Sequence, residues 1–141
     1  MLIQTAALLS PKQAPVNDIC NPAPIVTAAQ YRAALLAVRQ RMTPIQLAML
    51  QAHCKAEGHK ISTNQLADLL KLPTTSAAST SYRNYAHWIA DELKYTPAGP
   101  ASKPCWWLAL AYGLEEGVID GDYEWVMRPE LVETLQSMKW A

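Results

Sequence analysis

The spacing of apolar side chains in residues 61–94 predicts a short helix, a break and a longer helix. Ser62 or Thr63 can cap the start of the short helix, and Gln65 completes a capping box with Ser62. Pro73 ends this helix, because a proline in a helix interior loses a hydrogen bond and clashes with the preceding turn. The apolar faces expected to pack inward are Leu66, Leu69 and Leu70 in the short helix and Tyr82, Tyr85, Ala86, Ile89 and Leu93 in the longer one.

The longer helix also has a polar face on the side opposite its apolar residues. A short helix, a tight break and a longer helix with a polar outer stripe are typical of a helix-turn-helix motif. The polar stripe consists of Thr80, Arg83, Asn84, His87, Asp91 and Lys94.

Two further helices are predicted before this motif. Thr27 can cap a helix that runs to about Arg41. Thr43, Pro44 and Gln46 form a strong helix start, with a cap, a proline at the first helical position and the glutamine of a capping box. Gly58 is placed to end this second helix. The residues expected to face inward are Tyr31, Leu35 and Val38 in the first helix and Ile45, Leu47, Met49, Leu50, Ala52 and Cys54 in the second.

The C-terminal part predicts a hairpin and a closing helix. Residues 95–105 are rich in proline and predict a loop, and residues 106–112 alternate large and small side chains, which is the period of a strand. A Gly/Asp turn at 115–122 leads to a second alternating run at 123–127, so the two runs predict a hairpin. Pro129 then starts a helix whose inward residues are Leu131, Val132, Leu135 and Met138.

Together these elements predict one domain over residues 27–141 and a preceding tail. The domain is expected to be mainly α, a winged helix-turn-helix with four to five helices and a two-stranded β-hairpin as its wing. Residues 1–26 contain four prolines and show no lasting periodicity, so they predict a floppy tail or an arm that docks on something. The apolar stretch from Met1 to Leu9 has two alternative places to pack, this domain or a second copy.

Composition and charge neither require nor exclude a nucleic-acid partner. Half of the residues are apolar, and the chain has five Trp and six Tyr but no Phe; we expect Trp88, Trp106 and Trp125 to belong to the core. The formal net charge is zero. However, residues 27–112 carry nine Lys/Arg against four Asp/Glu, whereas residues 113–141 carry two against seven. This split permits a polyanionic partner without requiring one.

The cysteines and the hydropathy pattern indicate a cytoplasmic protein. Cys20, Cys54 and Cys105 are widely spaced and odd in number, which favours the reducing cytoplasm. No apolar run approaches the roughly 20 residues that span a bilayer, and the first ten residues lack a basic leader, so neither a membrane segment nor a secretory signal is expected.

No catalytic residue, metal site or cofactor is predicted. Cys54 lies beside His53, but neighbours on a helix do not face each other, so a buried structural cysteine is the preferred interpretation. Metal binding by these two residues with His59 would need the chain to fold back at Gly58. The acidic residues at 115–124 do not match a calcium-binding loop, which predicts a solvated acidic turn. Nothing in the sequence indicates a small-molecule substrate.

Double-stranded DNA is the partner that the motif predicts. In such proteins the second helix places its polar face in the major groove, while Lys/Arg and helix N-termini hold phosphates. Arginine suits guanine and asparagine suits adenine, because each can make two hydrogen bonds to that base edge. The alternative is a solvated helix face with no ligand. The expected base contacts are Ser79, Thr80, Arg83, Asn84 and His87, and the expected phosphate contacts are Lys60, Asn64, Lys71, Lys94 and Lys103.

A protein-interaction or inhibitor module is the rival function. An acidic hairpin and the N-terminal arm would bind a basic partner or a second copy, and an acidic protrusion would suit a host-defence or phage counter-defence protein that occupies a nucleic-acid groove. The same acidic residues weigh against DNA, because carboxylates repel phosphates. They are Glu115, Glu116, Asp120, Asp122 and Glu124.

Two stretches resemble a known family. Thr43-Pro44-x-Gln46-x-Ala48-Met49-Leu50-x-Ala52-His53 and Trp125-Val126-Met127-Arg128-Pro129-Glu130-Leu131 are similar to a module that precedes the nuclease domain of some bacterial His-Asn-His (HNH) endonucleases. The resemblance covers about residues 27–140 and implies a DNA-reading winged helix of bacterial or phage origin. This sequence departs from the family because it has no nuclease domain, so the resemblance implies recognition without cutting.

Overall fold

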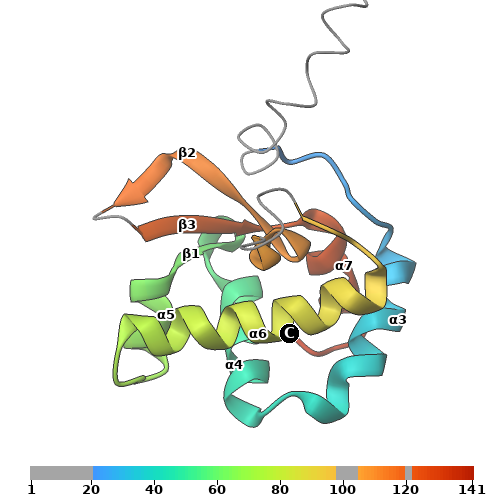
Figure 1. Ribbon diagram of the computed structural model, residues 1–141, viewed down its shortest axis with the longest axis horizontal. Helices are drawn as coiled ribbons and strands as arrows, with labels where there is room; N and C mark the ends of the chain where they lie inside the picture. Colours follow the sequence, from blue (N-terminus) through green and yellow to red (C-terminus); the bar gives the residue numbers. More distant parts are fainter. Residues whose placement is uncertain (1–20, 98–104, 120–121) are drawn as a thin grey trace, which may run out of the picture.

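The computed structural model describes residues 21–97, 105–119 and 122–141, without the side chains of 114–119, 122 and 123 (Figure 1). This part is mainly helical with a small three-stranded antiparallel sheet. The helices are α3 (Ala28–Val38), α4 (Pro44–Lys55), α5 (Thr63–Leu69), α6 (Thr75–Leu93) and α7 (Pro129–Ser137); the strands are β1 (Lys60–Ser62), β2 (Ala111–Ile119) and β3 (Asp122–Met127); and short 3-10 turns are η2 (Arg39–Arg41), η3 (Glu57–His59) and η4 (Trp106–Ala109).

Side-chain caps fix where the helices begin. At α4 the Thr43 hydroxyl accepts from the Gln46 amide at 3.1 Å, and the Gln46 side chain accepts from the Thr43 amide at 3.0 Å. Ser62 makes the same reciprocal pair with Gln65 at the start of α5. These capping boxes confirm the predicted helix starts, because each needs only two side chains within four residues. Thr27 with Gln30 caps α3 in the same way, Thr74 caps α6, and Pro129 is at the start of α7.

Gly58 does not cap α4 as predicted. The helix ends at Lys55, and Gly58 follows within η3. Its φ of +66° lies in the left-handed region that glycine adopts without steric cost. Gly58 therefore turns the chain from η3 into β1, rather than ending the helix.

The sheet has the strand order β1-β3-β2, and its first strand was not predicted. Ile61 pairs with Trp125, and Ala111 pairs with Met127. A strand of three residues is too short to show the alternation on which prediction relies. The predicted two-stranded hairpin is therefore part of a three-stranded sheet.

The interval before the hairpin also differs from the prediction. Residues 106–109 form the 3-10 turn η4, and β2 begins at Ala111 and continues to Ile119, so most of the predicted acidic turn lies in a strand. The alternation of large and small residues does not correspond to an alternation of buried and exposed ones, since Trp107, Leu108 and the two following residues are all buried. A strand with one covered face would bury only every second side chain.

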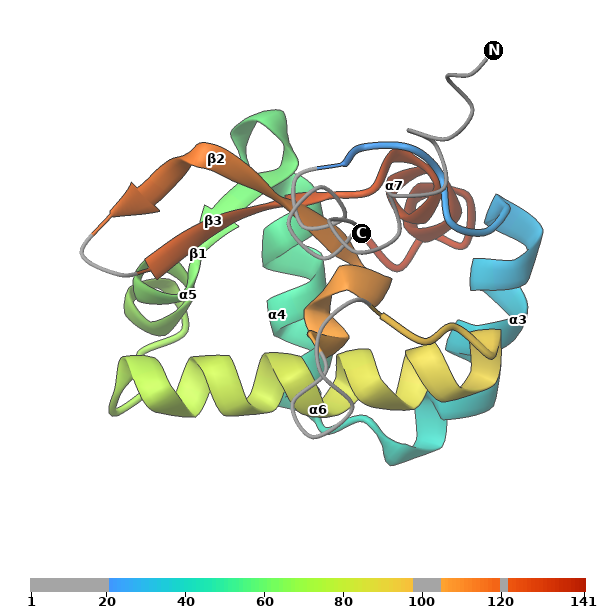
Figure 2. The same ribbon diagram turned by 45° about the horizontal axis from the view of Figure 1, so that its top comes forward.

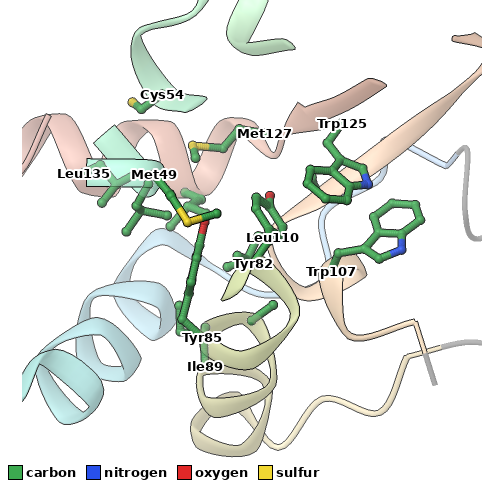
Figure 3. Packing of buried hydrophobic residues seen from close by; sticks show 14 of the residues in the cluster. Met49, Cys54, Tyr82, Tyr85, Ile89, Trp107, Leu110, Trp125, Met127 and Leu135 are labelled. Atoms are coloured by element: carbon green, nitrogen blue, oxygen red, sulfur yellow. The ribbon is translucent and has the colours of Figure 1, made fainter. Parts of the chain in front are cut away.

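The core gathers around α6. Tyr82, Tyr85 and Ile89 are buried on the face predicted for them, and Figure 3 shows them among residues of α4, the sheet and α7. α5 packs against α6 near its N-terminus, whereas α3 packs against α6 and α7 at the other end of the molecule (Figures 1 and 2). The free end of the β2–β3 hairpin lies at the α5 end of α6 in both views.

Several predicted core residues lie at the surface instead. Leu69 is 61% exposed and Ile45 is 43% exposed, although both occupy apolar positions in the helical pattern. Among the tryptophans, Trp125 is 4% exposed as predicted, whereas Trp88 and Trp106 are only half-buried. Periodicity identifies a helix face but not its width, which depends on the elements packed against it.

A buried arginine holds the end of the predicted tail on the domain. Arg128 donates from Nε to the Leu108 carbonyl and from Nη1 to the Ala23 carbonyl, both at 3.0 Å. Residues 21–26 therefore contact the domain; the rest of the predicted tail, 1–20, lies outside the described residues.

Candidate nucleic-acid interface

The outer face of α6 presents most of the predicted base-contacting residues together. Thr80, Arg83 and Asn84 are exposed, and Ser79 is half-buried beside them. Residues three and four apart on a helix are neighbours, so these side chains form one polar patch. We call Ser79, Thr80, Arg83 and Asn84 the α6 polar patch. It lies in the N-terminal half of the helix.

His87 is not part of this open patch. Its ring stacks on Trp106, with the centroids 3.7 Å apart and an interplanar angle of 11°. Its Nε2 atom also lies 3.5 Å from a carboxylate oxygen of Asp91, one turn later. η4, which carries Trp106, packs against α6 at this point. His87 is therefore partly covered, with its side chain 44% exposed, whereas Thr80, Arg83 and Asn84 are open.

A short hydrogen bond joins the beginnings of α5 and α6. The Thr75 hydroxyl donates to the side-chain oxygen of Asn64 at 2.6 Å, and Thr74 caps α6 by accepting from the Ala77 amide at 3.0 Å. Asn64, predicted as a phosphate contact, therefore helps to hold the two helices together. Lys71 lies in the turn between them, exposed and with a φ of +55°.

The predicted phosphate-contacting lysines do not lie in one place. Lys71 precedes α6, whereas Lys94 is its C-cap, and the helix between them is about 28 Å long at 1.5 Å per residue. Lys60 is exposed on β1, beside a groove that it lines together with Glu124. Lys103 lies outside the described residues. Of these lysines, Lys71 is the one next to the N-terminal end of α6.

The acidic residues of the rival prediction lie along the hairpin. Glu124 is half-buried on β3, where its backbone pairs with Ser62. Glu115 and Glu116 belong to β2 and Asp122 begins β3, but their side chains are among those the structure does not describe. Asp120 lies outside the described residues.

His53 is a structural residue at the centre of a buried polar cluster. Its Nε2 lies 2.8 Å from the Trp125 carbonyl and its Nδ1 lies 3.0 Å from the Tyr82 hydroxyl. A carbonyl only accepts, so Nε2 carries the proton, and Nδ1 accepts from Tyr82. This arrangement joins α4, α6 and β3 through a neutral ring. Burial lowers the His53 pKa from 6.5 to about 4, against the smaller opposing effect of its hydrogen bonds.

The neighbouring residues likewise show structural contacts. Burial raises the pKa of the Cys54 thiol, whereas a reactive cysteine needs a lowered one. The His59 ring is hydrogen-bonded through Nδ1 to the Cys54 carbonyl at 2.6 Å. Within the described residues, no group of three or more His, Cys, Asp or Glu side chains could hold a metal ion.

Two aromatic contacts beside α6 were missed by sequence reasoning. One is the stack of Trp106 on His87. In the other, the Arg41 guanidinium lies 4.6 Å from the ring centroid of Trp88, a cation–π contact. Two adjacent tryptophans at 106 and 107 are an unusual sequence feature that signals an aromatic contact, but no local pattern indicates which of the two rings contacts α6.

No family model, curated protein or solved structure matches the chain. Among the described residues, no helix is both long enough and apolar enough to cross a bilayer.

Proposed function

We propose that this protein binds double-stranded DNA through a winged-helix domain and has no catalytic activity of its own. The single observation that carries the proposal is the α6 polar patch. It combines an arginine, an asparagine and hydroxyl groups on one exposed helix face, and these side chains suit the edges of bases in the major groove.

The order of elements supports the winged-helix part of the proposal. β1, α5 and α6 follow α4, and the β2–β3 hairpin follows α6 after η4. α5 and α6 are adjacent and pack together, as the two helices of a helix-turn-helix do. In this arrangement α6 would be the recognition helix and the hairpin the wing.

The distribution of charge along α6 favours an approach by its N-terminal half. From residue 75 to residue 90 the helix carries Arg83 and no carboxylate, while Asp91 and Glu92 lie in its last turn. The positive end of the helix dipole adds to this preference for an anion. Lys71 lies at the same end. The free end of the acidic hairpin lies at this same end of α6 (Figures 1 and 2), so its acidic residues oppose the approach of phosphates and favour the rival function below.

The test is fluorescence anisotropy of labelled mixed-sequence duplexes at two salt concentrations, followed by selection of a preferred sequence. We expect binding that weakens steeply with salt, because phosphate neutralisation releases counterions. Lys71→Gln should lower the slope of log K against log salt by about one. Lys94→Gln is its matched control: it removes the same charge from another exposed lysine with positive φ at the far end of α6, and should leave the slope unchanged.

Sequence preference is tested by Arg83→Ala. Loss of a bidentate contact to a base should cost about 1–3 kcal/mol on the selected site and relax the preference at one position. Arg32→Ala removes an exposed arginine from α3 and should retain the preference. Equal affinities for Arg83→Ala and the parent on the selected site would refute this docking model.

The rival function is a protein-interaction module that uses the acidic hairpin. It is favoured by the seven acidic residues within 113–141 and by the absence of an overall positive charge. If the protein binds no duplex at low salt, this rival replaces the DNA proposal, and a basic protein partner becomes the subject of the search.

A further inference from the structure

A groove of about 790 Å³ lies where α5, β1, β3 and the turn before β1 meet. Ile61, Leu69 and Val126 provide apolar surface within it, and Lys60 and Glu124 are among its polar residues. We call this the β1 groove. None of the residues of the α6 polar patch lines the β1 groove, so the two surfaces share no residue.

Two features mark the β1 groove as a docking surface. Leu69 is 61% exposed, the highest value among the exposed large apolar residues of the described chain. β1 is at the edge of the sheet, so one side of its backbone is not paired with another strand of the described residues. An exposed apolar side chain next to an unpaired strand edge is a combination that proteins usually cover.

We propose that residues 1–9 of the same chain occupy the β1 groove. The segment Met-Leu-Ile-Gln-Thr-Ala-Ala-Leu-Leu contains seven apolar residues and no charged side chain. Such a segment can bury apolar surface against Leu69 and Val126 without desolvating a charge. Its two polar residues, Gln4 and Thr5, tolerate a position at the rim.

The covalent connection makes this occupant geometrically reachable. Residues 21–26 are held on the domain by the hydrogen bond from Arg128 to the Ala23 carbonyl. Arg128 comes two residues after Val126, about 7 Å along an extended chain, and the length of the Arg128 side chain adds to the distance from Val126 to Ala23. Residues 10–20 can span up to about 36–40 Å when extended, which far exceeds this separation. A tethered segment also binds at a high effective concentration, so weak contacts suffice.

The proposal is tested by NMR of the full chain with labelled Leu, Ile and Val methyl groups. We expect NOEs between the Leu69 methyl groups and those of Leu2, Ile3, Leu8 or Leu9. Leu69→Asp should remove the dispersion of the methyl resonances of residues 1–9 and shift them to unstructured positions.

Leu36→Asp is the matched control, because Leu36 is 55% exposed on α3 and does not line the groove. It should leave the resonances of residues 1–9 unchanged. The double substitution Leu8→Asp, Leu9→Asp changes no described residue and should shift the Leu69 methyl resonances. Because the groove itself is unaltered in this variant, such a shift could not be caused by misfolding of the groove.

The absence of NOEs to Leu69 in the parent would overturn the proposal. So would NOEs that arise only between labelled and unlabelled molecules, because they would assign the groove to a second copy. The result is independent of DNA binding, so either proposal can fail alone.

Discussion

Acidification should destabilise this protein through His53. The ring is buried and neutral, and its pKa is lowered from 6.5 to about 4, chiefly by burial. Between these two values the unfolded chain binds a proton that the folded chain does not. The free energy of unfolding should therefore fall as the pH drops below about 6.5, and this contribution should level off below about 4.

The magnitude follows from the difference between the two pKa values. Each unit corresponds to about 1.4 kcal/mol, so the whole effect is about 3 kcal/mol, a large part of the stability of a domain of this size. Protonation would also require Nδ1 to donate, whereas it now accepts from the Tyr82 hydroxyl. The resulting loss would be shared by α4, α6 and β3, which meet at this ring.

Urea unfolding between pH 4.5 and 7.5 measures the effect, and an NMR titration of the His53 ring measures the pKa in the folded protein. His53→Gln retains a donor for the Trp125 carbonyl but does not titrate, so it should lose stability at pH 7 and show a flatter pH dependence than the parent. His87→Gln is the control, because its side chain is 44% exposed and lies outside the buried cluster; it should leave the ring resonances of His53 unchanged. A His53 ring that titrates near pH 6.5 in the folded protein would refute this reasoning, as would equal pH dependence in His53→Gln and the parent.

Two pairs of substitutions test the packing around α6 by chemical denaturation. Tyr82→Phe should cost about 1–3 kcal/mol, because His53 loses a hydrogen-bond donor, whereas Tyr85→Phe should be neutral or stabilising, because the buried Tyr85 hydroxyl has no partner in the described structure. Destabilisation of Tyr85→Phe as large as that of Tyr82→Phe would contradict the assigned contacts. Trp125→Ala should cost about 3–5 kcal/mol, and Trp106→Ala clearly less, because the first ring is buried and the second is half-buried. Equal losses for the two tryptophans would show that their burial has been assigned wrongly.

The helix starts could be predicted because they depend on neighbours in sequence. Thr43 with Gln46 and Ser62 with Gln65 form their capping boxes within a single turn, so no distant residue is needed. The inward face of α6 was also predictable, because Tyr82 and its partners repeat at the helical period. The α6 polar patch could be predicted for the same reason, since it lies on the side of the helix opposite the buried face.

The errors arose where distant segments determine the structure. β1 exists because Ile61 pairs with Trp125, far along the chain, and three residues give no periodic signal. The stack of Trp106 on His87 was not foreseen either, because η4 brings Trp106 to α6 from a distant part of the sequence. Leu69 was placed in the core because it shares the apolar spacing of Leu66; Leu66 is buried, whereas Leu69 is 61% exposed and lines the β1 groove.

The sequence by itself therefore determined where most helices begin, which face of α6 packs inward and which polar residues lie opposite. These features follow from contacts within one or two turns. The tertiary structure decided that the hairpin gains a third strand, that Trp106 stacks on His87, and that Leu69 lines a groove. Each of these features depends on which segments, distant in sequence, pack together in the folded protein, and the local spacing of residues carries no information about that packing.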